Sequence, residues 1–355
     1  MAVHDSFAVF IITLVTTVLL ALILRRYAPY LNLMDTSGQE DRKHHQGKPA
    51  QVGGLAIIAS VTTVLGVYYG SALPPSFWPI ITGALLLAIM GSIDDARHIP
   101  ALRKLFFQIV IVLIVILGFN LQLATAGDIF NFAKLPPYVG FLFSLFGFLV
   151  FINAFNFIDG LDGLAGGIAA VILLTMLIIA FQNHGATAGP IILIVGLLGS
   201  LCGFLSLNLR TPFRKKAIVF LGDAGSLSIG FMIAGLAIEL ANTSVWISEI
   251  PHPVIYAYIL AYPLYDMMAV FIIRGFKNKS LFQADMTHLH FLLKKTGYAD
   301  GRIALYLILL SCIYGGIGLL LWNFDMSDMI SALLWVSLFA IHFLLYVFLH
   351  KKLSL

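Results

Sequence analysis

The stretch Asn153-Ala-Phe-Asn-Phe-Ile-Asp-Gly-Leu-Asp-Gly-Leu-Ala-Gly-Gly167 places two amides and two carboxylates between two long apolar runs. The polar side chains are Asn153, Asn156, Asp159 and Asp162. Ionisable groups are costly in lipid, and where they occur beside membrane helices they usually serve a function. We therefore expect this stretch to lie at the ends of two membrane helices and to belong to a functional site.

The composition indicates a membrane protein. Of the 355 residues, 60% are hydrophobic and 11% are charged, and the mean hydropathy is +0.97. A helix of about 20 apolar residues crosses a hydrocarbon core of about 30 Å, and runs of that length repeat along this chain. The predicted fold class is all-α: a polytopic transmembrane helical bundle in which residues 1–355 form a single integral membrane domain.

Eleven apolar runs, bounded by Gly, Pro, Asn or charged residues, are predicted to be membrane spans. They are residues 7–27, 50–69, 76–93, 103–121, 138–157, 163–182, 188–207, 218–240, 253–273, 301–322 and 329–350. With these spans, 20 of the 21 Lys and Arg residues fall on one side of the membrane, and Lys134 alone falls on the other. The positive-inside rule then places the N-terminus outside and the C-terminus in the cytoplasm.

The charge and the cysteines exclude two kinds of partner or site. The formal net charge is +4, but the basic residues are spread over alternate loops, so no nucleic-acid partner is predicted. Cys202 and Cys312 lie inside apolar runs. That placement predicts neither a disulfide framework nor a cysteine metal site.

The unusual polar residues all fall on the predicted cytoplasmic face. This face consists of the loops near residues 28–49, 94–103, 157–163, 208–217 and 274–300. The loop after the fifth span lies on the basic side, yet it contains no Lys or Arg. A bound cation or a positively charged neighbour explains this loop better than topology does.

Asp94 and Asp95 close the third predicted span. Adjacent residues point about 100° apart on a helix, so one partner cannot pair with both carboxylates. Two interpretations stay open. The two aspartates are solvated charges that pair with Arg97, or they belong to a metal or general-base site.

Asn156, Asp159 and Asp162 are spaced three residues apart, which would place them on one face of a continuous helix. The glycines at 160, 163, 166 and 167 indicate instead that one helix ends, turns tightly and is followed by another. In that case Asp162 has the alternative role of an N-cap residue for the sixth span.

The segment Phe220-Leu-Gly-Asp-Ala-Gly-Ser226 leads into the eighth span. In one interpretation Asp223 or Ser226 is the N-cap of that helix. In the other, Asp223 binds a hard cation such as Mg²⁺, which favours one or two carboxylates combined with substrate phosphates.

Histidines are the remaining candidate binding residues. His288 and His290 would diverge on a regular helix and share a side on an extended segment. Because no third histidine or cysteine lies nearby, phosphate or sugar binding is favoured over structural zinc. His45, close to Lys48, suits an anionic substrate, although loop charges also follow from topology. Asp266, inside the ninth span, is either hydrogen-bonded to tyrosines or reaches the site.

Together these motifs resemble the polyprenyl-phosphate N-acetylhexosamine-1-phosphate transferases over nearly the whole chain. The resemblance is carried by His45-Gln-Gly, Asp94-Asp95, Asn153 to Gly167, Phe220 to Ser226, Pro263 to Asp266, and Asp285 to His290. It is strongest to the bacterial undecaprenyl-phosphate GlcNAc-1-phosphate transferases of the WecA type. The implied enzyme moves GlcNAc-1-phosphate from a UDP-sugar to undecaprenyl phosphate, releases UMP and initiates cell-envelope glycan synthesis at the cytoplasmic face of the bacterial inner membrane.

The resemblance also implies a chemical role for the acidic residues. Asp94 and Asp95 match a catalytic pair, of which Asp94 positions or deprotonates the lipid phosphate. Asp223 and Asn156 match ligands of Mg²⁺, with Mn²⁺ as an alternative metal. Asp159 matches a catalytic residue just behind these ligands.

The remaining matches are to substrate-binding positions. Asp162 and Phe220 match residues that hold and stack on the uracil. His45 matches a nucleotide-sugar contact, and His288 and His290 match a motif that contacts the diphosphate and the sugar.

Two departures from the family pattern bear on the substrate. Phe291 stands where the family often has a further histidine, and Pro49 is displaced relative to the Gly53-Gly54 pair. The donor therefore stays open between UDP-GlcNAc, UDP-MurNAc-pentapeptide and a UDP-linked deoxy-N-acetylhexosamine. An ion-coupled transporter is the alternative from a different class, although its acids would lie near the bilayer midplane. A homodimer is an open alternative to a monomer.

Overall fold

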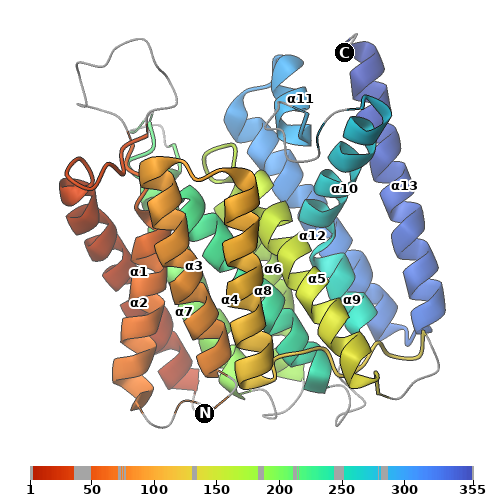
Figure 1. Cartoon of the computed structure of the whole chain (residues 1–355), viewed down its shortest axis with the longest axis horizontal. Helices are drawn as coiled ribbons and strands as arrows, with labels where there is room; N and C mark the ends of the chain where they lie inside the picture. Colours follow the sequence, from red (N-terminus) through yellow and green to blue (C-terminus); the bar gives the residue numbers. More distant parts are fainter. Residues whose placement is uncertain are drawn as a thin grey trace.

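The computed structural model describes residues 3–35, 49–70, 73, 75, 77–129, 134–182, 188–210, 214, 216–243, 252–278, 280 and 287–353. Thirteen helices and no strands are found among these residues (Figure 1). The helices are α1 (Val3–Tyr27), α2 (Gly53–Tyr69), α3 (Phe77–Arg97), α4 (Ala101–Phe119), α5 (Pro137–Phe157), α6 (Leu164–Gln182), α7 (Ala188–Asn208), α8 (Gly222–Thr243), α9 (Pro253–Ile259), α10 (Ala261–Phe276), α11 (Leu289–Lys295), α12 (Asp300–Asn323) and α13 (Asp328–Lys352).

The all-α, polytopic membrane fold is confirmed. Nine described helices are long and apolar enough to cross a membrane, and the bent pair α9 and α10 raises this number to ten. Helix α2 is apolar but has 17 residues. Each of the eleven predicted runs coincides with a helix or with the bent pair. Eleven crossings and the orientation of the termini stay predictions, although α1 begins and α13 ends at opposite ends of the bundle (Figure 1).

The predicted span over residues 253–273 is broken into two helices. The chain bends by 76° between α9 and α10. The cause lies in Pro263, whose ring has no N–H and clashes with the carbonyl four residues earlier in a continuous helix. That residue is Ile259, where α9 ends.

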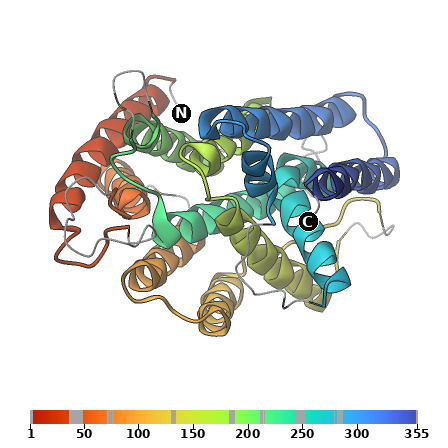
Figure 2. The same cartoon turned by 90° about the horizontal axis from the view of Figure 1, so that it is seen from above.

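Helix α8 is the central helix of the bundle, and Figure 2 shows it surrounded by its neighbours. Most of its residues are buried, and its N-terminal turn packs closely between α2 and α3. A Cβ atom added to Gly54 of α2 would overlap the backbone of Gly225, and one added to Gly91 of α3 would overlap Ala224. Glycine therefore allows three helix backbones to meet at the start of α8.

Two short backbone pairings hold the loop segments at this same end of the bundle. Ala50 forms isolated bridges with Met34 and with Val219. The Phe220 N–H donates to the carbonyl of Ala50 at 2.8 Å, and the Gly53 N–H donates to the carbonyl of Phe220 at 2.9 Å. These bonds fix the segment that leads into α8.

Candidate active site

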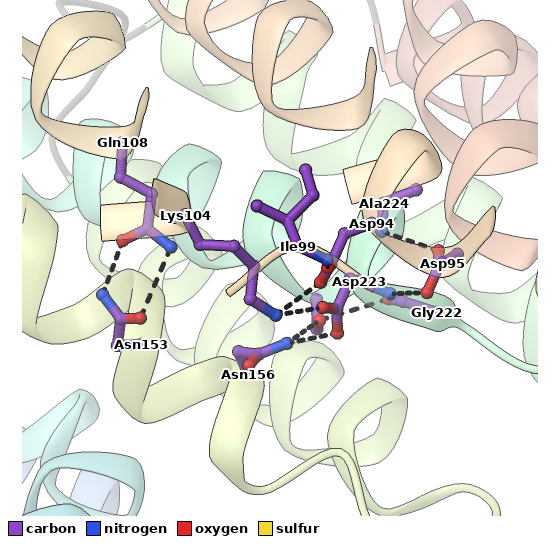
Figure 3. Close-up of polar contacts among 11 residues, drawn as sticks. Asp94, Asp95, Ile99, Lys104, Gln108, Asn153, Asn156, Gly222, Asp223 and Ala224 are labelled. Carbon is purple, nitrogen blue, oxygen red and sulfur yellow. Dashed lines mark hydrogen bonds and ion pairs between the residues drawn. The ribbon is translucent and has the colours of Figure 1, made fainter. Parts of the chain in front are cut away.

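The last turns of α3 and α5 and the first turns of α4 and α8 lie at the upper end of the bundle in Figure 1. Asp94 and Asp95 lie in the last turn of α3, Asn156 lies in the last turn of α5, and Asp223 lies in the first turn of α8. Four helix ends thus supply one polar cluster, in which Lys104 of α4 stands between carboxylates (Figure 3).

Lys104 joins two of the carboxylates. Its Nζ lies 2.5 Å from Oδ2 of Asp94 and 2.6 Å from Oδ2 of Asp223. The interpretation that Asp94 pairs with Arg97 is wrong, because the chain reverses at Pro100 and brings the first turn of α4 back to the end of α3. The other oxygen of Asp94 accepts the Ile99 N–H at 2.5 Å, which fixes this reversal.

Asp95 caps helix α8. Its two oxygens accept the Asp223 N–H at 2.9 Å and the Ala224 N–H at 3.2 Å, and these are first-turn donors that have no partner within their own helix. The N-cap role that sequence analysis considered for Asp223 or Ser226 is thus filled by a residue of α3. Asp95 and Asp94 have separate partners, as their angular separation on a helix predicts.

Amide side chains of α5 complete the cluster. Nδ2 of Asn156 donates to Oδ1 of Asp223 at 2.9 Å and to the Ser226 hydroxyl at 2.7 Å. One turn earlier, Nδ2 of Asn153 donates to Oε1 of Gln108 at 2.7 Å, and the reverse contact measures 3.4 Å. This pair connects α4 to α5 one helical turn away from Lys104 (Figure 3).

The loop after α5 is a tight turn, as its glycines predict. Helix α5 ends at Phe157, α6 begins at Leu164, and Gly163 has a φ of +79°. Asp162 pairs with Arg210 through an Nε to Oδ2 distance of 2.5 Å, so its carboxylate is directed to the loop after α7. The Gly163 N–H donates to Oδ1 of buried Asn208 at 2.7 Å.

A cavity of about 300 Å³ opens among these elements. Its wall includes most of the predicted acidic residues together with Asn156 and Phe220; the acids are Asp95, Asp159, Asp162 and Asp223. Burial raises the pKa of Asp159 to about 8, and the negative charges of Asp223, Asp95 and Asp162 add to this effect. The cavity therefore attracts cations.

The chemistry of the donor set fits Mg²⁺. Carboxylate oxygens of Asp159 and Asp223 and the amide of Asn156 line the same cavity, and hard cations prefer oxygen ligands of this kind. The volume that remains leaves room for substrate phosphates, which normally supply other ligands of Mg²⁺.

The two histidines lie against the turn after α5. His288 precedes α11 in an extended conformation, and its ring lies 6.0 Å from that of His290 at an interplanar angle of 14°. The rings share a side, as predicted for an irregular segment. A Cβ atom at Gly160 would collide with the His290 ring, and burial lowers the pKa of His290 to about 4. His45 lies outside the described residues, as does Asp285.

The interpretation that Asp266 is hydrogen-bonded to tyrosine is confirmed, and its reach to the active site stays a prediction. Its carboxylate is fully buried and accepts a hydrogen bond from the Tyr346 hydroxyl. It also lies 2.6 Å from Nδ1 of His288, so it reaches the histidine segment.

Sequence reasoning missed three residues at this end of the bundle. Lys104 and Arg210 were counted as topology signals, although each pairs with an acid. Gln108 was not singled out, although a lone glutamine in an apolar run is itself a signal that a polar partner lies nearby.

Comparison with known proteins identifies the family. The profile of glycosyl transferase family 4 matches residues 77–241. The undecaprenyl-phosphate α-N-acetylglucosaminyl 1-phosphate transferase of Salmonella typhi is 31% identical over 346 residues, which cover 96% of this chain and 89% of the relative. The chain belongs to the polyprenyl-phosphate N-acetylhexosamine-1-phosphate transferase family. It is therefore a membrane-bound enzyme of the phosphotransferase class.

Further relatives of the family are similar over the same extent. The protein of Escherichia coli K12 with the same name is 28% identical and covers 95% of this chain and 88% of its own length. A probable undecaprenyl-phosphate N-acetylglucosaminyl 1-phosphate transferase of Bacillus subtilis is 28% identical, with coverages of 96% and 88%. The residues that the family profile matches include Asp94 and Asp223, whereas His288 and His290 lie outside the matched range.

Proposed function

We propose that this enzyme transfers GlcNAc-1-phosphate from UDP-GlcNAc to undecaprenyl phosphate, giving UMP and the lipid-linked sugar diphosphate. The observation that carries the proposal is the acid-lined cavity at the ends of α3, α5 and α8, which lies on the same bundle as an apolar groove. A polar nucleotide sugar and a long lipid need these two environments side by side.

The apolar groove has a volume of about 520 Å³ and lies between α5, α8, the bent pair and α13. Phe143, Val150, Leu264 and Trp335 are among the residues that line it. Val150 and Asn156 are six residues apart on α5, which corresponds to about 9 Å along a helix. An isoprenoid chain lying in the groove would bring its phosphate to the polar cluster.

Lys104 is suited to hold the phosphate of the lipid acceptor. An ammonium group has three N–H donors, and two of them point at Asp94 and Asp223. The third remains for a phosphate oxygen. Asp94 then positions the acceptor through Lys104, and the positive charge of Lys104 favours the deprotonated, nucleophilic form of the phosphate.

Asp223 and Asn156 are the residues that would hold Mg²⁺, or Mn²⁺ as the alternative. Nδ2 of Asn156 is used for Asp223 and Ser226, which leaves Oδ1 as its cation ligand. When bound, the metal would neutralise charge on the diphosphate. Asp159 lies beside these ligands in the cavity wall, where a bound cation would favour its ionised form. Asp95 keeps the first turn of α8, and so Asp223, in place.

The other cavity residues would bind the donor. Phe220 offers an aromatic face for the uracil and Asp162 an acceptor for its N–H. His288 and His290 are not among the residues that line the cavity, but they lie against the turn after α5 and are assigned to the diphosphate and sugar. A phosphate oxygen of the lipid forms a bond to the β-phosphorus, the bond from this phosphorus to the bridging oxygen breaks, and UMP leaves. A two-step route through an aspartyl phosphate is the alternative.

The polar cluster is proposed to face the cytoplasm of a bacterial inner membrane. This follows from the 20 basic residues predicted on that side and from the cytoplasmic supply of nucleotide sugars. The same end of the bundle carries Lys294 and Arg210, both paired with Asp300.

A donor panel tests the proposal. Purified enzyme in detergent, with Mg²⁺ and undecaprenyl phosphate, would be given UDP-GlcNAc, UDP-MurNAc-pentapeptide or a UDP-linked deoxy-N-acetylhexosamine, and lipid products identified by mass spectrometry. We expect product from UDP-GlcNAc, and Asp223→Ala should abolish it. Product from another donor alone would overturn the sugar assignment. Lack of lipid product from every donor would favour the transporter alternative.

A further inference from the structure

Asp266 is a fully buried carboxylate in the middle of α10. Oδ2 lies 2.6 Å from Nδ1 of His288. Oδ1 accepts the Leu289 N–H at 2.9 Å and the hydroxyl of Tyr346. A charge removed from water is costly unless it is paired and hydrogen-bonded, and here each oxygen has a partner on another segment.

The pairing decides which nitrogen of His288 is available. When Nδ1 carries the proton that is donated to a carboxylate, Nε2 is left with a lone pair, and a second proton on the ring would be borne there. The His288 ring cannot turn freely, because the centroid of the Phe157 ring lies 5.2 Å from its own centroid and the His290 ring lies nearly parallel to it. His288 therefore presents Nε2 in one orientation.

A capping role alone does not account for this geometry. Holding the start of α11 needs an acceptor for the Leu289 N–H, which Oδ1 supplies. Oδ2 is directed at the imidazole, which packs on Phe157 at the end of α5, next in sequence to Asn156 of the cavity wall. On the other face of α10, Leu264 and Met268 line the apolar groove. Helix α10 therefore contributes residues to the wall of the groove on one face and the carboxylate that contacts His288 on the other.

We propose that Asp266 is a positioning residue that fixes His288 in the Nδ1–H tautomer, so that Nε2 is presented to the sugar of the nucleotide sugar as an acceptor for a hydroxyl or amide N–H. Tyr346 of α13 orients the carboxylate through its hydroxyl. The inference rests on the proposed function, because the sugar is that of the proposed donor.

The tautomer can be measured without substrate. In enzyme labelled with ¹⁵N-histidine, held in detergent at pH 8, the resonances of His288 would be assigned by their loss in His288→Gln. We expect a protonated Nδ1 and an unprotonated Nε2 in the wild type, and a mixture of tautomers in Asp266→Asn. A protonated Nε2 in the wild type would overturn the proposal, as would an unchanged pattern in Asp266→Asn.

A double-mutant cycle tests the consequence for activity. Second-sphere partners of functional histidines typically contribute about 10- to 100-fold, so Asp266→Asn should lower kcat/KM for UMP release by that factor. In the His288→Gln background the same change should have no further effect, because the residues act as one unit. Losses that multiply would show that Asp266 does not act through His288 and would overturn the proposal.

A matched control is available one turn away. The buried hydroxyl of Tyr262 makes no hydrogen bond within the described part of the chain, so Tyr262→Phe should leave kcat/KM unchanged, whereas Tyr346→Phe should lower it. If Asp266→Asn does not fold, the tautomer seen in the wild-type spectrum and the kcat/KM of Tyr346→Phe still test the proposal. If the wild type has no transferase activity, the proposed function fails, and the spectrum alone decides the tautomer.

Discussion

The Nζ atom of Lys104 lies 2.6 Å from Oδ2 of Asp223, and the same ammonium lies 2.5 Å from Asp94. Two helices that are distant in sequence, α3 and α8, are thus held together at their polar ends by one cation from α4. In the proposed reaction this cation faces the lipid phosphate. The first prediction concerns its removal.

Lys104→Met should lower kcat for UMP release by about 10²- to 10³-fold, the usual effect of losing a charged group that stabilises a transition state. Lys104→Arg should retain part of the activity, because the charge remains. Lys351→Met removes an exposed cation at the end of α13 and is the control. Equal activities of Lys104→Met and Lys351→Met would show that Lys104 has no part in the reaction.

Asp95 and Asp223 should differ in the kind of loss they cause. Asp95→Ala removes the acceptor of two N–H groups at the start of α8, and loss of a cap costs about 1 to 2 kcal/mol of stability. We expect a lower Tm in detergent together with lower activity. Asp95→Asn should recover part of both. In Asp223→Ala the activity should be lost at a nearly unchanged Tm, and a large drop in its Tm would contradict a primarily chemical role.

The close approach of α2 to α8 predicts a sharp contrast between two glycines of α2. In Gly54→Ala the new methyl would overlap the Gly225 backbone, and overpacking of this kind costs about 1 to 3 kcal/mol. The start of α8 would shift, so both Tm and activity should fall. At Gly66 nothing lies within 4 Å of an added Cβ, so Gly66→Ala should lose neither. Similar behaviour of the two variants would argue against the packing described.

A histidine at the opposite end of the bundle should make stability depend on pH. Nδ1 of His252 lies 2.6 Å from Oδ2 of Asp328, and this hydrogen bond raises the pKa of His252 above its ordinary value of 6.5. A raised folded-state pKa gives stabilisation that is complete below pH 6.5 and is lost as pH rises through the folded pKa.

Wild-type Tm should therefore fall by about 1 to 2 °C more than that of His252→Gln between pH 6 and pH 9, a small effect because the imidazole is partly exposed. Thermal unfolding in detergent at several pH values measures the difference. Parallel pH dependences of the two proteins would exclude the contribution of this pair.

The sequence predicted those features that depend on neighbouring residues alone. The glycines after Asn156 predicted the end of one helix and the start of another, and the apolar runs predicted the helices around them. The bend at Leu260 was not predicted, although Pro263 is visible in the sequence, because proline in a membrane helix is often accommodated without a break.

The pairings between helix ends could not be predicted in the same way. Whether Asp94 pairs with Lys104 or Arg97 depends on how α3 and α4 are rotated about their axes, which the hydrophobic pattern of buried helices hardly specifies. Lys104 obeys the positive-inside rule, so its position gave no separate indication that it pairs with Asp94 and Asp223. Asp266 meets His288 because α10, α11 and α13 converge, which is a property of the packed bundle alone.

The most direct test of the proposed reaction follows the β-phosphate of the donor. Enzyme in detergent with Mg²⁺ and undecaprenyl phosphate would receive UDP-GlcNAc labelled with ³²P at the β-position, and the lipid and nucleotide products would be separated. We predict that the label enters the lipid fraction, that UMP is the released nucleotide, and that neither occurs without the lipid phosphate. Label retained in released UDP would contradict sugar-phosphate transfer, because the bond broken would then lie between the sugar and the phosphate.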